Sequence, residues 1–173
     1  MKRTTLSTLL LVLAVILPSA LRAQKFAYID TEYILNKIPT YKSAQEQLDK
    51  LSEQYQKEIE NRYAQVEKMY NDYQAEKVLL TEEMKKKRED EIIAKEREVK
   101  DLQMSYFGRD GQVYKKREEL IKPIQEQVYN AVKEIATEGG YAVIFDAAAS
   151  GNMIYTNSRY DRSDEVLQKL GYK

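Results

Sequence analysis

Apolar side chains recur at alternating spacings of three and four residues along the first part of the chain. They occupy Tyr41, Ala44, Leu48, Leu51, Tyr55, Ile59, Tyr63, Val66, Tyr70 and Tyr73. This spacing is typical of the heptad stripe of a coiled-coil helix, and one stutter near Ile59 predicts a local unwinding of the supercoil. The segment from Thr40 to Phe107 runs for 68 residues without Gly or Pro, which favours one long helix or two in succession.

A reversal of the chain is predicted near Leu80. The apolar run 78–80 breaks the heptad pattern, and Thr81 followed by two glutamates is a typical helix start. A second, sparser stripe then comprises Met84, Ile92, Val99, Leu102, Tyr106, Val113, Leu120 and Ile124. The segments before and after the reversal are nearly equal in length, about 60 Å each at 1.5 Å per residue. Equal lengths predict an antiparallel helical hairpin.

Two glycines, Gly108 and Gly111, interrupt the second segment, opposite about Leu48 to Ser52 in the predicted register. Each Gly costs roughly 1 kcal/mol relative to Ala inside a helix. They form either a hinge near the base of the hairpin or a local irregularity where the hairpin meets the rest of the protein. The sequence leaves both interpretations open.

The two ends of the chain predict short strands and helices. The segments 25–30 and 141–146 are apolar and aromatic-rich, as buried strands are, and 153–155 is compatible with a returning strand. Short helices are expected over 31–37 and after the capping segment 161–164. Pro123 is expected to interrupt the helical segment that precedes it. A further helix is expected after Pro123 and ends at Gly139 and Gly140.

The predicted fold class is therefore α+β. Segments 24–40 and 121–173 form a small β-sheet body, and the hairpin arm over 41–120 is inserted between them. Such a body has little core, so we expect it to oligomerise through the edges of its sheet. The expected oligomerisation residues are Phe26, Tyr28, Ile29, Tyr141, Val143, Ile144 and Phe145.

Residues 1–23 have the composition of a secretory signal peptide. Lys2 and Arg3 precede an apolar run over 6–17, and cleavage is expected near Ala23 and Gln24. The remaining 150 residues carry 25 basic and 28 acidic side chains, a formal charge of −3. We therefore expect an exported, soluble protein, and the negative charge argues against nucleic acid as a partner.

The chain contains no His and no Cys. Their absence removes the usual general base, the commonest metal ligand and the Ser-His and Cys-His arrangements. The segment 108–111 is glycine-rich but lacks the strand-loop-helix context of a phosphate-binding loop. We therefore expect no enzymatic activity, no metal and no cofactor.

Three segments in this order resemble the Skp/OmpH family of periplasmic chaperones. They are the opening 26–35, the stretch 120–146 and the closing capped helix 161–167, and the resemblance spans essentially all of the chain after residue 23. It implies a trimer with a β-sheet body and three helical-hairpin arms. The cavity between such arms holds unfolded outer-membrane β-barrel proteins without ATP, and so prevents their aggregation before membrane insertion. The best-known member is strongly basic, whereas this chain is slightly acidic after residue 23.

The alternative interpretation is a structural coiled-coil spacer of the cell envelope. A spacer does not need two helices of equal length joined by a reversal. An enzyme is a third, more distant class.

Client contact by the arm is expected to rest on tyrosine and methionine, which offer adaptable apolar area. The candidates are Tyr55, Tyr63, Met69, Tyr70, Tyr73, Met84, Tyr106 and Tyr114. Four of these tyrosines occupy heptad positions, so they either fill the seam between the helices or face the client. The basic cluster Lys85, Lys86, Lys87 and Arg88 lies beside the predicted tip. It is a candidate contact with anionic lipid or lipopolysaccharide, although flanking acidic residues largely cancel its charge.

Overall fold

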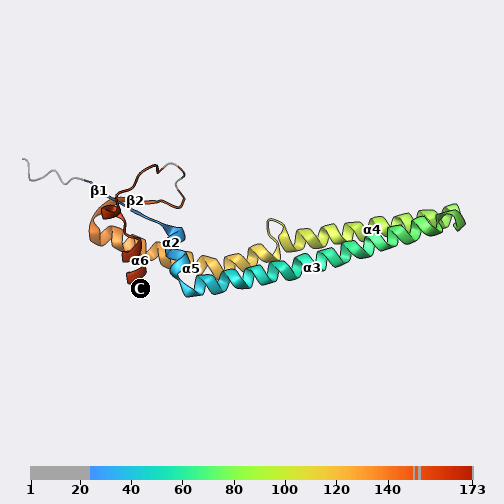
Figure 1. Cartoon of the computed structure of the whole chain (residues 1–173), viewed down its shortest axis with the longest axis horizontal. Helices are drawn as coiled ribbons and strands as arrows, with labels where there is room; N and C mark the ends of the chain where they lie inside the picture. Colours follow the sequence, from blue (N-terminus) through green and yellow to red (C-terminus); the bar gives the residue numbers. More distant parts are fainter. Residues whose placement is uncertain (1–23, 150, 152, 173) are drawn as a thin grey trace, which may run out of the picture.

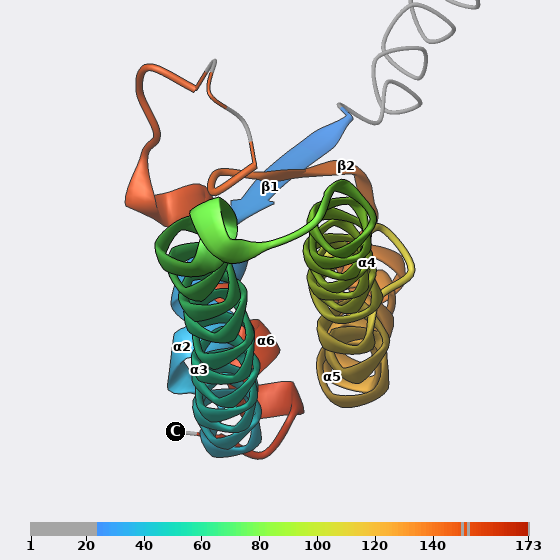
Figure 2. The same cartoon turned by 90° about the vertical axis from the view of Figure 1, so that its right-hand side faces the viewer.

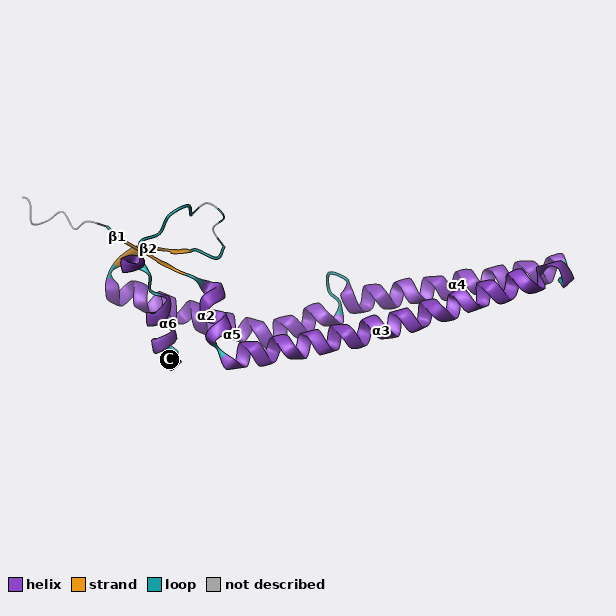
Figure 3. Cartoon of the chain, viewed as in Figure 1, coloured by secondary structure: helices purple, strands orange, loops and turns teal. Residues whose placement is uncertain are grey.

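The computed structural model describes residues 24–149, 151 and 153–172, so the predicted signal peptide lies outside the described residues. The molecule is elongated, with a small body at one end from which two long antiparallel helical segments extend (Figure 1). Figure 3 separates the helices of this arm from the short strands and loops of the body. The predicted α+β class with a helical-hairpin arm is confirmed.

The arm leaves the body along α3 (Pro39–Glu76) and returns along α4 (Glu82–Phe107). Between them the chain makes one short 3-10 turn, η2 (Lys77–Leu79). Thr81 caps α4, because its side chain accepts a hydrogen bond from the backbone N–H of Met84. The predicted reversal with Thr81 as the helix cap is confirmed.

The seam between α3 and α4 is narrow. Its fully buried side chains recur every seven residues, as Ile59, Val66 and Tyr73 on α3 and as Ile92, Val99 and Tyr106 on α4. A two-stranded coiled coil normally buries two positions per heptad. Here the second position is only partly covered, as at Met69 and Leu102. The arm therefore has a thin apolar core.

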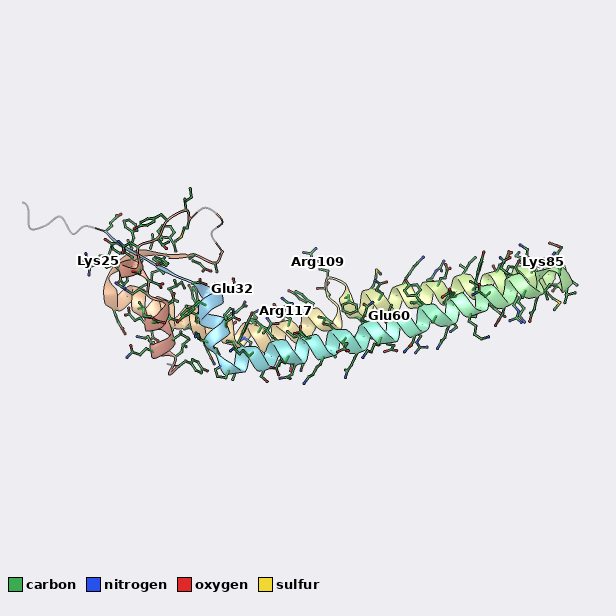
Figure 4. All side chains as sticks on the ribbon, viewed as in Figure 1. Lys25, Glu32, Glu60, Lys85, Arg109 and Arg117 are labelled. Atoms are coloured by element: carbon green, nitrogen blue, oxygen red, sulfur yellow. The ribbon has the colours of Figure 1, made fainter. Side chains whose placement is uncertain are left out.

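A loop over residues 108–111 separates α4 from α5 (Gln112–Gly139). It bulges away from the arm, and Arg109 projects from it (Figure 4). The Gly108 N–H still donates to the Met104 carbonyl at 2.8 Å, and the Lys115 N–H resumes helical bonding to the Gly111 carbonyl at 3.0 Å. The loop is a local irregularity in shape, and a hinge at this position stays a prediction.

The predicted register at this loop was wrong. The ring of Tyr55 stacks on Tyr106, and its hydroxyl donates to the side-chain oxygen of Gln112, so the loop lies opposite Tyr55 and not opposite 48–52. The prediction assumed a tight reversal at Leu80. The η2 turn and the extended residues that follow it displace the returning helix along α3.

The body pairs segments from the two ends of the chain. β1 (Lys25–Ile29) and β2 (Tyr141–Asp146) form a parallel two-stranded sheet within the described residues. The whole arm connects these two strands, and in the view along the arm both lie to one side of its helices (Figure 2). Two short helices, α2 (Thr31–Lys37) and α6 (Ser163–Lys169), complete the body together with the 3-10 turn η3 (Ser158–Tyr160).

The expected returning strand over 153–155 is not formed. These residues are irregular, and the position beside β1 is taken by Asp161, which forms an isolated parallel bridge with Tyr28. The Arg162 N–H donates to the Tyr28 carbonyl at 2.9 Å. The backbone groups of β1 that a third strand would need are therefore already used in part by the approach to α6.

Pro123 lies inside α5 and does not interrupt it, contrary to the prediction. A proline in a helix interior costs about 3 kcal/mol, because it removes one backbone hydrogen bond and crowds the preceding turn. Ile121 and Ile124 on either side of it are buried in the body core, whereas Pro123 itself is exposed. Packing of the buried face holds the helix continuous through the proline.

The body core joins the base of the arm to the sheet and the short helices. It contains Ile29, Ile34, Ile38, Ala44, Leu48, Ile121, Ile124, Val128, Ala131, Ile135, Val166 and Leu167. The predicted domain boundaries stay a prediction, and the core shows that α3 contributes Ala44 and Leu48 to the same cluster as β1 and α6.

Candidate functional site

Three of the candidate tyrosines fill the seam of the arm. Tyr73 is 4 % exposed and Tyr106 9 % exposed, and Tyr55 packs against Tyr106 with a distance of 3.8 Å between the two ring centroids. The Tyr106 hydroxyl donates to a carboxylate oxygen of Glu58 at 2.8 Å, and the Tyr73 hydroxyl donates to Glu89. Each bond crosses from one helix of the arm to the other, so these tyrosines fix the register of the hairpin.

These bonds also change the acidity of the phenols. The hydrogen bond to Glu89, with burial as a second cause, raises the pKa of Tyr73 to about 12. The hydrogen bond to Glu58 likewise raises the pKa of Tyr106 above its usual value. Both side chains are therefore neutral hydrogen-bond donors at physiological pH.

The other candidate side chains of the arm lie outside the seam, except Met69, which packs partly buried against it. Tyr63 is 39 % exposed, Tyr70 51 %, Met84 50 % and Tyr114 48 %. The two exposed tyrosines of α3 occupy heptad positions, but each comes four residues after a fully buried seam residue. At about 100° per residue such a position is turned roughly 40° from the seam.

The tip of the arm exposes both aliphatic and basic side chains. Val78 is 88 % exposed and Leu79 83 % exposed in η2. In the basic cluster, Lys85 pairs with Glu82 at 2.7 Å and Arg88 lies 3.7 Å from Glu76 and from Glu91. Lys86 and Lys87 are exposed and form no ion pair with any described residue. Figure 4 places Lys85 at the end of the arm far from the body.

The sheet of the body has one buried and one exposed face. Ala27 and Ile29 point into the core, whereas Phe26 is 48 % exposed, and Val143 and Phe145, on β2, are 42 % and 47 % exposed. An open groove of about 660 Å³ lies beside this face, lined by Phe26, Tyr28, Phe145, Tyr155, Tyr160 and neighbouring residues. Tyr141 and Ile144 instead pack against the core, and the Tyr141 hydroxyl accepts a hydrogen bond from Arg162 Nε at 2.7 Å.

The family model of OmpH, described as outer membrane protein (OmpH-like), matches residues 25–170. The chain belongs to the OmpH-like family. Among solved structures, this OmpH-like chain is similar to a Caulobacter crescentus CB15 protein described as an OmpH-like outer membrane chaperone. The two share 12 % identity with a TM-score of 0.64, over 86 % of this chain and 84 % of that one, which shows a common fold. The search of curated proteins gave no match.

Sequence reasoning missed several exposed apolar side chains of this OmpH-like chain. Ile93 is 54 % exposed, Met104 67 % and Phe107 41 % on α4, and Tyr129 is 67 % exposed on α5. The available signal was a large apolar residue that falls outside the heptad stripe of a highly charged helix. Such a residue lies outside the seam and leaves apolar area on the surface of the protein.

Within the described residues, no cluster of three or more Asp or Glu side chains is arranged to hold a metal ion.

None of the described helices combines the length and the apolar character needed to cross a membrane.

Proposed function

We infer that this OmpH-like protein is an ATP-independent holdase chaperone of the periplasm. It binds unfolded outer-membrane β-barrel proteins between its helical arms and prevents their aggregation before membrane insertion. Membership of the OmpH-like family and the shared fold with an OmpH-like outer membrane chaperone support this proposal. No catalytic step and no cofactor take part in it.

One observation supports holding most directly. The arm exposes large apolar side chains that its own seam does not use, including Tyr63, Tyr70, Met84 and Tyr114. Separate, partly exposed aromatic and thioether side chains give many weak and adaptable contacts. An unfolded client needs contacts of this kind, because it presents no fixed surface to recognise.

Holding inside a cavity also requires several arms, and the proposal therefore includes a homotrimer. The exposed sheet face, with Phe26, Val143 and Phe145, and the groove beside it offer an apolar surface for neighbouring subunits. Ile29, Ile144 and Tyr141 support that surface from the core side. Export through cleavage near residue 23 places the assembled protein in the periplasm.

A weak contact of the arm tips with anionic lipid or lipopolysaccharide is the second part of the proposal. Lys86 and Lys87 are its best candidates, because Lys85 and Arg88 are already paired with carboxylates. A variant with Lys86→Glu and Lys87→Glu should bind anionic vesicles less than the unchanged protein. Equal binding by both proteins would remove lipid contact from the proposal.

Light scattering tests the chaperone function. The solution mass of residues 24–173 is measured alone and with an unfolded outer-membrane β-barrel protein diluted from urea. We expect a trimer on its own and, with client present, a soluble complex of one trimer with one client molecule. If the solution mass stays the same when client is added and the client aggregates, the envelope spacer is favoured instead.

A further inference from the structure

The two flanks of the arm, on either side of the seam between α3 and α4, differ in chemistry. Each residue of a helix is rotated by about 100° from the one before. Residues one and four places after a seam residue therefore lie on one flank. Residues one place before and three places after it lie on the other.

The first flank carries exposed apolar side chains. Tyr63 and Tyr70 follow the seam residues of α3 by four places, and Ile93 and Phe107 directly follow the seam residues of α4. We call the surface on this side of the arm, which carries these four side chains, the aromatic flank; the exposed fractions of the four are 39 %, 51 %, 54 % and 41 %.

The second flank carries ion pairs and a small groove. Arg62 pairs with Glu58 at 3.4 Å and Lys95 with Glu98 at 2.5 Å, while Arg88 bridges Glu76 and Glu91 nearer the tip. In the sequence, each of these residues stands one place before, three places after or four places before a seam residue. We call the surface formed by Glu58, Arg62, Gln65, Lys95 and Glu98 the ion-paired flank.

The residues that line this groove show that the ion-paired sides of α3 and α4 lie next to each other. Its volume is about 270 Å³, and it is lined from both helices by Arg62, Gln65, Val66, Met69, Lys95, Glu98, Val99 and Leu102. Every lining residue is a seam residue or belongs to the side one before or three after it. The side that carries Tyr63 and Tyr70 and the side that carries Ile93 and Phe107 must therefore also lie together.

We propose that unfolded client docks along the aromatic flank as an extended apolar segment, while the ion-paired flank faces away from it. This inference rests on the proposed holdase function and names the surface that performs it. Tyr73 and Tyr106, hydrogen-bonded inside the seam, hold the two helices in register but do not touch client.

The spacing of the aromatic flank decides what kind of partner fits. A partner helix, including one from a second copy of this chain, needs two apolar positions per heptad to interlock. The aromatic flank offers at most one apolar position per heptad on each helix, because Glu60, Glu67 and Lys100 occupy the neighbouring flank positions. Extended polypeptide can touch isolated side chains one after another and does not need a continuous stripe.

The charge of the aromatic flank points to the same partner. One or four places after the seam residues stand the bases Lys77 and Lys100 and the acids Glu60, Glu67 and Glu96. These charges nearly cancel, so the flank selects neither an acidic nor a basic ligand. An apolar segment of an unfolded β-barrel protein matches a surface with this balance.

Neighbouring positions on α3 allow a matched test. Gln65 and Glu67 stand one place before and one place after Val66, so they lie on opposite flanks at the same height of the arm. The chain has no native Cys, so Gln65→Cys and Glu67→Cys each give a single labelling site. Each is labelled with a polarity-sensitive fluorophore, and an unfolded outer-membrane β-barrel protein is added. We expect a blue shift with the label at 67 and no shift with the label at 65.

The outcomes separate this inference from the proposed function. If the protein keeps the client soluble but the label at 65 responds as strongly as that at 67, the flank assignment is wrong and the holdase function stands. If the protein does not keep the client soluble, the proposed function fails and the flank assignment fails with it.

A second measurement removes the tyrosines themselves. Tyr63→Ser combined with Tyr70→Ser should weaken client binding about thirtyfold, since each of the two lost aromatic contacts contributes on the order of 1 kcal/mol. The control combines Arg62→Ser with Gln65→Ser on the ion-paired flank and should leave affinity unchanged. Circular dichroism verifies that both variants keep their helix content. Equal weakening by the two pairs would contradict the proposal.

Discussion

Tyr73 and Tyr106 show how single residues define the arm. Each fills the apolar seam with its ring, and each donates its hydroxyl to a carboxylate on the facing helix. A slip of the hairpin would leave a buried phenol without an acceptor, and an unmade hydrogen bond of this kind is costly. Tyr63 and Tyr70 look alike in the heptad pattern but remain exposed, so residue type and spacing alone do not separate the two roles.

The Tyr73 bond predicts a dependence of stability on alkaline pH. Its pKa rises from 10.0 to about 12 in the folded arm, so the folded state retains the phenolic proton where the unfolded chain loses it. The stabilisation is therefore fully present below about pH 10 and is lost as the pH rises towards about 12. We expect the difference in melting temperature between the protein and its Tyr73→Phe variant to shrink across this range.

Thermal unfolding followed by circular dichroism at several pH values measures that difference. Tyr106 titrates in both proteins, so their comparison isolates Tyr73. A difference that stays constant up to about pH 12 would show that the bond to Glu89 does not shift the pKa in solution.

At the scale of elements, the returning half of the hairpin is divided and the outgoing half is not. α3 is continuous over 38 residues, whereas a loop separates α4 from α5. The loop requires glycine for steric reasons. A Cβ atom on Gly108 would lie 2.3 Å from the Met104 carbonyl oxygen, and one on Gly111 would lie 2.6 Å from that of Tyr106.

Gly111→Ala should therefore destabilise the protein by about 1 to 3 kcal/mol, because backbone must shift to admit the new methyl group. Urea unfolding followed by circular dichroism measures the loss. Gly151→Ala is the control, since nothing lies within 4 Å of a Cβ atom at that position. Equal stability of the two variants would mean that the loop rearranges freely, as the hinge interpretation expects.

At the scale of the whole molecule, the chain combines a thin arm with a small body that leaves one sheet face uncovered. Phe26, Val143 and Phe145 are exposed on this face although their strands are apolar. A body of this size buries little surface by itself. Assembly with other copies would cover the face and place several arms around one space.

Phe145→Asp should convert the expected trimer into monomers, because it places an unpaired charge in the centre of that face. Analytical ultracentrifugation measures the assembly state. Asn36→Asp adds a charge on the exposed surface of α2 and should leave the trimer intact. A protein that is monomeric before any substitution would contradict the assembly proposal.

The sequence by itself determined the elements and their order. The heptad spacing, the Thr81 cap and the strand pattern over 141–146 depend on neighbouring residues, so they predicted the hairpin and β2 correctly. Local rules also underlay the two failures in the body. Pro123 remains inside α5 because distant residues pack against Ile121 and Ile124, and 153–155 forms no strand because Tyr28 bonds elsewhere.

Tertiary structure decided which face each side chain presents. The register of α4 against α3, the depth of burial of Tyr55 and Tyr73, and the exposure of Ile93 and Phe107 depend on how two distant segments meet. A rotation of about 40° separates the exposed Tyr63 and Tyr70 from the seam residues of α3, and a heptad pattern does not resolve that angle. The parallel pairing of β1 with β2 across the whole arm likewise depends on packing between the ends of the chain and not on any local signal.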